Sequence, residues 1–127
     1  MTTRRFCLLP LLGALAGCAT PQAAAPPLPS ALEAGWEGER TCQLMHETPT
    51  HRVLRCTFPP GVGHERHFHP PHFAYALSGG RMQINDAKGT RTVDLATGSS
   101  YSNPGIPWHE GLNVGETTVI YLIVEER

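Results

Sequence analysis

Glycine and proline divide the chain from Glu39 onward into short runs, and this division restricts the fold more than any other feature. Of the 127 residues, 13 are glycine and 12 are proline, and both favour turns. No helical periodicity persists through three turns, and the runs instead alternate polar and apolar residues as strands do. Eight strands are expected, at 39–46, 51–58, 73–78, 81–85, 90–95, 99–103, 107–112 and 117–125.

The last of these runs is apolar without interruption from Val119 to Val124, which is typical of a strand covered on both faces. Eight strands at this spacing predict a sheet closed on itself as a sandwich or barrel. The formal charge of −1 provides no basic surface, so we expect no nucleic-acid partner. The sequence predicts one all-β domain.

The first seventeen residues have the composition of an export signal. Arg4 and Arg5 precede an apolar run at 6–17 that is too short to span a membrane. The residues Leu-Ala-Gly-Cys at 15–18 resemble a bacterial lipobox, in which cleavage before Cys18 leaves its thiol to carry lipid. A signal peptide that is cleaved without lipidation is the alternative.

The next segment, 18–37, is rich in alanine and proline, and we expect it to be a disordered, extended tether before a domain at 38–127. Ala19 after Cys18 resembles the signal for outer-membrane sorting in Gram-negative bacteria. We therefore expect a periplasmic domain, attached by lipid alone to the outer membrane rather than the inner one.

Two cysteines, Cys42 and Cys56, remain in the mature chain. They lie at equal distances from Pro49, between two strand-like runs, as directly opposed residues of a hairpin would. An oxidising compartment permits a disulfide between them. The alternative is a pair of free thiols that pack as small apolar groups.

Five of the seven histidines lie in two short stretches. His67 and His69 are two residues apart and share one face of a strand. His72 follows a Pro-Pro bend, and His109 belongs to the second stretch. Neutral imidazoles bind Fe, Mn, Zn, Ni or Cu, so these four are candidate ligands of a divalent transition metal. His64 has the opposite strand parity to His67, which favours a position beside the site or at the surface.

Both stretches resemble the two conserved motifs of the cupins, on the residues Gly61-x5-His67-x-His69 and Gly98-x5-Pro104, followed by His109-x3-Asn113. The resemblance implies a single conserved barrel, the double-stranded β-helix or RmlC-like jelly roll, with a metal inside. Two motif positions differ: Ile106 replaces the glycine of the second motif, and His72 stands where the first motif has a glutamate.

The loss of the glutamate leaves two possibilities for the metal site. Either His72 is a fourth ligand, or it stays outside and His67, His69 and His109 hold the metal alone. Without a carboxylate the site should prefer softer divalent metals to hard cations. Some cupins have lost their metal and use the barrel only to bind a ligand.

Strand parity also predicts the lining of the barrel. If His72 faces inward, so do Ala74 and Ala76, and these small residues leave space for a small-molecule ligand. The outward stripe must then be covered by the N-terminal strands or by a second subunit in a homodimer; it consists of Phe73, Tyr75 and Leu77.

The sequence contains no nucleophile triad, phosphate-binding glycine loop or dinucleotide fingerprint. Any chemistry would therefore come from the metal. One hypothesis is a metal-dependent, dioxygenase-like oxidoreductase acting on a small substrate. The other is a non-catalytic envelope lipoprotein that binds a metal or a small ligand.

Overall fold

The computed structural model describes residues 23–127, and the predicted export signal and Cys18 lie outside this range. The described residues form eleven strands and no helix, so no helix among them could cross a membrane. The strands are β1 (Gly35–Trp36), β2 (Glu39–Arg40), β3 (Cys42–Glu47), β4 (His51–Phe58), β5 (Gly63–His69), β6 (His72–Ser78), β7 (Gly80–Asp86), β8 (Gly89–Leu95), β9 (Ser100–Asn103), β10 (Ile106–Asn113) and β11 (Val119–Glu126).

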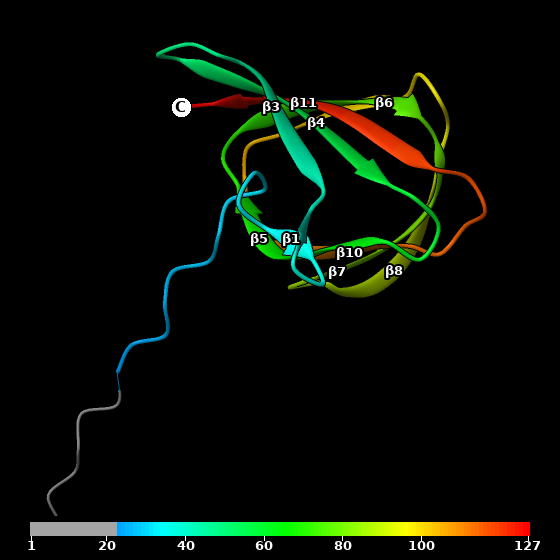
Figure 1. Ribbon diagram of the computed structural model, residues 1–127, viewed down its shortest axis with the longest axis horizontal. Helices are drawn as coiled ribbons and strands as arrows, with labels where there is room; N and C mark the ends of the chain where they lie inside the picture. The colour runs from blue at the N-terminus through cyan, green and yellow to red at the C-terminus, as the bar shows by residue number, and fades with distance from the viewer. Residues whose placement is uncertain (1–22) are drawn as a thin grey trace, which may run out of the picture.

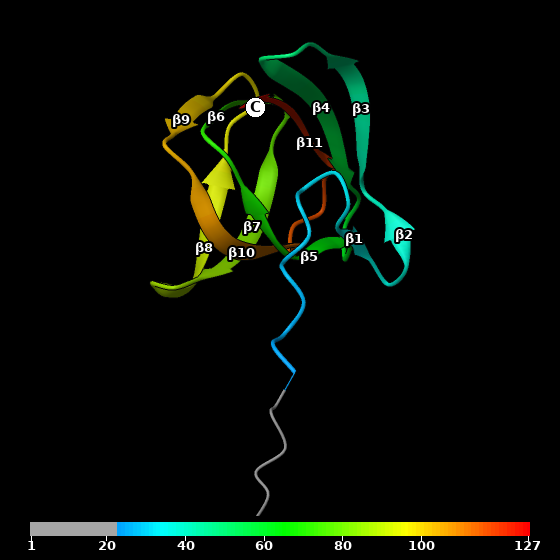
Figure 2. The ribbon, with the colours of Figure 1, turned by 90° about the vertical axis from the view of Figure 1, so that its left-hand side faces the viewer.

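Two antiparallel sheets face one another and enclose the core (Figure 1). One has the strand order β3-β4-β11-β6-β9 and the other β5-β10-β7-β8. β1 and β2 form a separate hairpin that lies beside β5 (Figure 2). The predicted all-β barrel is confirmed, and its two sheets are arranged as a jelly roll.

The core lies between the sheets and follows from the alternation of each strand. Val119 and Ile123 of β11 and Leu54 of the adjacent β4 share one buried cluster with Met82 of β7, which belongs to the opposite sheet. β11 pairs with β4 on one side and β6 on the other. This central position explains its continuous apolar run, because half-buried residues of β11 also line the outer face of the sheet.

The folded domain begins earlier than the predicted boundary at residue 38. Ser30 forms an isolated bridge with Phe68, and Ala31 is fully buried in the core. The backbone N–H and the hydroxyl of Ser30 both donate to the Glu33 carboxylate, at 2.9 Å each, and fix a tight turn. Part of the segment predicted as a tether, from Ser30 onward, therefore packs against the barrel, because alanine can be buried without showing any strand-like alternation.

The structure contains the disulfide between Cys42 and Cys56. The two residues are direct partners in the register of β3 and β4, and their Cα atoms are 4.0 Å apart. Both side chains are buried in the core. The bridge therefore ties the edge strand β3 to the main sheet.

The parity predicted for β6 is confirmed. Ala74 and Ala76 are buried inside the barrel. The outward stripe is exposed by 38 to 44% and consists of Phe73, Tyr75 and Leu77. The N-terminal strands β1 and β2 do not cover it, since they lie beside the opposite sheet.

Candidate metal centre

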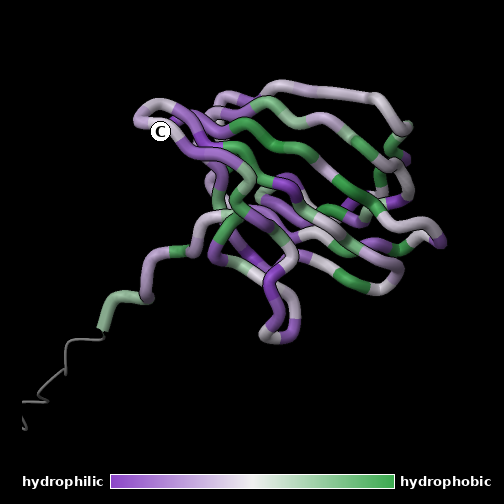
Figure 3. Tube along the Cα trace, turned by 45° about the horizontal axis from the view of Figure 1, so that its top comes forward, coloured by the Kyte–Doolittle hydropathy of each residue, from purple (hydrophilic) through white to green (hydrophobic). Residues whose placement is uncertain are grey.

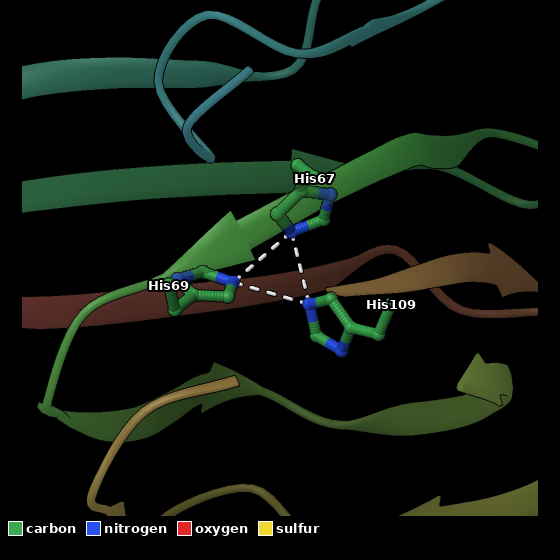
Figure 4. A group of neighbouring side chains, drawn as sticks. All are labelled: His67, His69 and His109. Carbon is green, nitrogen blue, oxygen red and sulfur yellow. Dashed lines mark hydrogen bonds between the residues drawn. The ribbon is translucent and has the colours of Figure 1, made fainter. Parts of the chain in front are cut away.

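Two antiparallel strands, β5 and β10, bring three histidines to one point inside the barrel. His67 and His69 lie on the same face of β5, and His109 on β10 is the register partner of His67. Their Nε2 atoms point toward one another (Figure 4). The distances between these atoms are 3.0 Å for 67–69, 3.1 Å for 69–109 and 2.9 Å for 67–109.

Hydrogen bonds on the far side of two rings determine which nitrogen carries the proton. His67 Nδ1 lies 2.6 Å from the Glu65 carbonyl oxygen, and His69 Nδ1 lies 2.7 Å from a Glu125 carboxylate oxygen. Both oxygens are acceptors, so each Nδ1 must donate. In the neutral tautomers of His67 and His69, each Nε2 therefore carries a lone pair.

This arrangement fits a metal ion. Two lone pairs 3.0 Å apart repel each other unless a cation lies between them. Two nitrogens that are each about 2.1 Å from one ion, at a right angle, lie about 3.0 Å apart. His109 has no Nδ1 partner among the described residues, so its Nε2 can also present a lone pair. The chemistry of the three donors and their separations thus match a transition-metal site.

Burial keeps these imidazoles neutral. Burial, together with the smaller effect of the neighbouring histidines, lowers the pKa of His67 to about 2 and that of His109 to about 3. A metal can bind only the unprotonated nitrogen. The two side chains are therefore in the binding form at neutral pH without having to lose a proton.

His72, the fourth predicted ligand, is not part of the trio. It is buried, and its ring centroid lies 4.7 Å from that of His69. Its Nδ1 donates to the carbonyl oxygen of Pro70 at 2.9 Å. Burial also lowers its pKa. The structure thus assembles His67, His69 and His109 and leaves His72 packed beside them.

Glu125 is a site residue that the sequence analysis missed. Its side chain is fully buried at the end of β11, and its carboxylate accepts from His69 Nδ1 at 2.7 Å and from Arg52 Nε at 2.5 Å. Burial alone would raise its pKa, but the bonds to His69 and Arg52 outweigh this and hold the pKa below its usual value. A signal was present, because Glu125 has the parity of the inward-facing Ile123.

His64 lies beside the trio, in one of the two positions expected from its parity. Its Nε2 donates to the carbonyl oxygen of Ala31 at 2.9 Å, and its ring centroid is 3.8 Å from that of His67. Burial lowers its pKa to about 4. His64 therefore connects the N-terminal turn to the metal centre.

Asn113, the last residue of the second motif, has a structural role. Its buried side-chain amide donates to the carbonyl oxygens of Phe58 and Thr117, at 2.7 and 2.8 Å. Its Oδ1 accepts from the backbone N–H of Gly115 at 2.9 Å. These bonds hold the loop that follows β10 and thereby fix the strand that carries His109.

Two cavities that share several lining residues border the trio. A small internal cavity of about 50 Å³ is lined by all three histidines together with Phe58 and Met82. A larger cavity of about 310 Å³ reaches His109 from the end of the barrel at the β7–β8 turn. We call this larger space the entrance cavity; it is lined by Met82, Ile84, Asp86, Lys88, Arg91, Val93, Leu95, Tyr101, Asn103, Ile106, His109 and Tyr121.

Solved cupin structures are similar to this fold. A cupin domain from Bordetella pertussis Tohama I has a TM-score of 0.64 at 20% identity, over 81% of this chain and 99% of that chain. An RmlC-like cupin from Shewanella frigidimarina NCIMB 400 has a TM-score of 0.50 at 16% identity, over 67% and 73%. KdgF from Halomonas sp. has a TM-score of 0.50 at 15% identity, over 72% of this chain and 87% of that chain.

No protein-family model matches the sequence, and no curated protein matches it. At these identities the solved structures establish the fold alone. The described chain has the fold of a single cupin barrel and contains a histidine trio that could hold a metal.

Proposed function

We propose that this protein binds one divalent transition metal through His67, His69 and His109. The observation that carries the proposal is the pair of lone pairs on His67 and His69, which their hydrogen bonds to Glu65 and Glu125 direct at one point. Fe, Mn, Zn, Ni and Cu all suit an imidazole site, and the absence of a carboxylate from the trio disfavours hard cations.

We further propose that the site is catalytic, as a dioxygenase-like oxidoreductase acting on a small molecule. When bound, a metal there would supply Lewis-acid or O₂-activating chemistry. The entrance cavity supports this activity, because it leads from the β7–β8 end of the barrel to His109. A purely storage or structural site would not need such access.

The residues around the trio have separate tasks in this activity. Glu65 and Glu125 orient the rings of His67 and His69, and the packing of His64 and His72 on those rings excludes water from their faces. Ala74 and Ala76 keep the inner surface of β6 small. These residues hold the unprotonated nitrogens toward the cavities that border the trio.

We also propose that the protein is exported and lipid-anchored at Cys18, facing the periplasm from the outer membrane. The lipobox-like residues 15–18 support this location, and the Cys42–Cys56 disulfide suits an oxidising compartment. Mass spectrometry of the mature N-terminus tests it. We expect a diacylglyceryl group on Cys18, and an unmodified cysteine or cleavage at another site would contradict the proposal.

Metal analysis tests the central proposal. The protein is purified without a histidine tag or a nickel column, and its metal content is measured by inductively coupled plasma mass spectrometry. We expect about one equivalent per chain. His67→Ala and His69→Ala should each abolish this stoichiometric metal, whereas His46→Ala, at an exposed position of β3, is the matched control and should retain it.

Two results would overturn the metal proposal. One is a folded wild-type protein that contains no metal and whose thermal stability does not respond to chelators. The other is equal metal content in the His67→Ala, His69→Ala and His46→Ala proteins. Oxygen consumption by the metal-loaded protein in the presence of a substrate separates the enzyme from the alternative, an envelope lipoprotein that only binds.

A further inference from the structure

The entrance cavity carries an excess of positive charge, and this suggests which class of ligand the cavity takes. The inference rests on the proposed function, because the cavity ends at His109 of the metal trio. Its lining includes acidic, basic, amide and phenol side chains. The question is which of their hydrogen-bonding groups are already occupied by the protein.

The carboxylate and amide oxygens of the lining already accept hydrogen bonds from the protein. Asp86 Oδ1 accepts from the backbone N–H of Lys88, and its Oδ2 accepts from Arg91, both at 2.9 Å. Asn103 Oδ1 accepts from the backbone N–H of Gly105 at 2.9 Å. Each of these oxygens keeps a second lone pair, but the negative charge of Asp86 is already paired with Arg91.

The donors, in contrast, are available. Among residues 23–127, no hydrogen bond involves the hydroxyl of Tyr101 or Tyr121, and no carboxylate forms an ion pair with Lys88. Arg91 uses one N–H group on Asp86, and a guanidinium has five. Lys88 is the single lysine of the chain, and it lies at the β7–β8 turn, at the rim of the cavity.

The remaining walls are hydrocarbon. They come from β7, β8 and β10 and consist of Met82, Ile84, Val93, Leu95 and Ile106. A cavity of about 310 Å³ is at the lower end of the range for small-molecule sites. Apolar walls would bury the hydrocarbon part of a ligand, but they offer nothing to the hydroxyl groups of a polyol.

We propose that the entrance cavity binds a small carboxylate with a hydrocarbon body, whose anionic group is held by Lys88 and Arg91 at the rim and by the phenol hydroxyls within. A carboxylate only accepts hydrogen bonds, so it can use the free N–H groups of Lys88 and Arg91 and the phenol O–H groups. The lining has one carboxylate against two cations, so an amine or a metal cation would meet net positive charge. An uncharged polyol would gain nothing from this charge.

A pair of probes with the same shape tests this proposal. Benzoate and benzamide differ in charge and in donors but have the same ring. Binding of each is measured by calorimetry with the metal-loaded protein and with the same protein after chelator treatment. We expect benzoate to bind more tightly than benzamide, and we expect this preference to decrease as salt increases, because the rim charges are exposed to solvent.

Variants of the lining residues test which side chains bind the carboxylate group of benzoate. Lys88→Gln should weaken benzoate binding about fivefold, as for the loss of a partly exposed ion pair, and should leave benzamide binding unchanged. Tyr121→Phe should weaken benzoate binding by a similar factor. Tyr75→Phe, on the exposed outer face of β6, is the matched control and should have no effect. Lys88 lies in an exposed turn, so its replacement should not affect folding.

The two preparations distinguish this proposal from the metal proposal. If benzoate binds equally with and without chelator and Lys88→Gln weakens it, the carboxylate site stands even where the protein holds no metal. If benzoate binds only to the metal-loaded protein and ignores Lys88→Gln, the metal alone binds it and the proposed site is wrong. Equal binding of benzoate and benzamide also overturns the proposal.

Discussion

At the scale of single residues, the main feature is a buried carboxylate that accepts a hydrogen bond from one histidine of the trio. Glu125 pairs in register with His72 on β6 and with Arg52 on β4, so the three side chains form a row across adjacent strands. The cupin motif has its glutamate at position 72. In this chain a histidine occupies that position, and the carboxylate of the neighbouring strand binds His69 instead.

Glu125→Gln should weaken metal binding about 10- to 100-fold, the usual effect of changing a partner of a metal-binding histidine. The carboxylate fixes the Nδ1–H tautomer of His69 and increases the basicity of its Nε2. The amide of glutamine can fix the tautomer but does not increase the basicity. A competition titration with a chromophoric Zn²⁺ chelator measures the affinity. The electronic spectrum of the Co²⁺-loaded protein reports whether the ligand geometry changes.

Glu110→Gln is the control for this substitution. Glu110 pairs with Arg66 on the exposed side of β10, at 2.8 Å, and its replacement should leave Zn²⁺ affinity unchanged. If Glu125→Gln folds normally and binds Zn²⁺ as tightly as Glu110→Gln does, the positioning role of Glu125 is disproved.

The buried His64 makes the metal-free protein sensitive to acid. Its pKa is about 4 in the folded state against 6.5 for an ordinary histidine, so the unfolded state binds more protons between these values. The free energy of unfolding should therefore be highest above pH 6.5 and should decrease as the pH falls from 6.5 to 4. The histidines of the trio act in the same direction, because burial lowers the pKa values of His67 and His109 as well.

Urea unfolding of chelator-treated protein at a series of pH values measures this decrease. His64→Gln should make the dependence on pH shallower by up to about 3 kcal/mol across the range, because glutamine does not titrate and can still donate to the carbonyl oxygen of Ala31. An equally steep dependence in His64→Gln would show that His64 does not contribute.

At the scale of strands and turns, the sequence predicts the strands in which polar and apolar residues alternate, and it does not predict the strands that lack this alternation. The hairpin of β3 and β4 and the parity of β6 follow from polar and apolar alternation between turns. β5 was not among the predicted runs, because its inward residues are histidines and a pattern of hydrophobic residues cannot detect them. Only the spacing of His67 and His69 indicated a strand there.

Elements that depend on distant contacts were also missed. β1 and β2 contain two residues each, too few for any periodic signal. The ring of Trp36 packs against Gly63, where an added Cβ would lie 2.6 Å from it, and neither residue indicates this contact in sequence. Likewise, Glu125 was recognisable as inward-facing only by its parity, whereas its partners Arg52 and His69 lie on other strands.

The disulfide between β3 and β4 should contribute about 3 kcal/mol to the free energy of unfolding. Its two cysteines are 14 residues apart, and closing a loop of this length reduces the entropy of the unfolded chain by about that amount. The double variant Cys42→Ala, Cys56→Ala removes it, and urea unfolding measures the loss. Wild-type protein in the presence of a reductant should show a similar decrease, and no decrease in either case would contradict the prediction.

At the scale of the whole molecule, the outer face of the five-stranded sheet has no partner within residues 23–127. Leu122 lies directly across from Tyr75, and Val124 from Phe73, so the exposed stripe of β6 continues onto β11. Figure 3, in which this side of the barrel comes forward, shows hydrophobic segments along neighbouring strands. Exposed apolar patches larger than a few hundred Å² mark interaction sites.

We expect a second copy of the chain to cover this outer face. Five strands about 4.8 Å apart and seven residues about 3.4 Å apart give a flat area of about 550 Å². This area is below the roughly 800 Å² per partner of a standard interface and within the range of weaker ones. Residues 23–29 run away from the barrel on the other side (Figure 2), so they do not compete for the face, and a two-fold axis would place each stripe against its counterpart.

Sedimentation equilibrium tests this assembly, with Tyr75→Lys as the disruptive variant. A lysine from each subunit would place like charges together at the centre of the interface, so the wild-type dimer should dissociate into monomers. Val114→Lys is the matched control, because Val114 is similarly exposed but lies in the loop after β10, away from this face. The Val114→Lys protein should remain dimeric. A monomeric wild-type protein, or dimers of Tyr75→Lys as stable as those of Val114→Lys, would show that another partner covers the outer face.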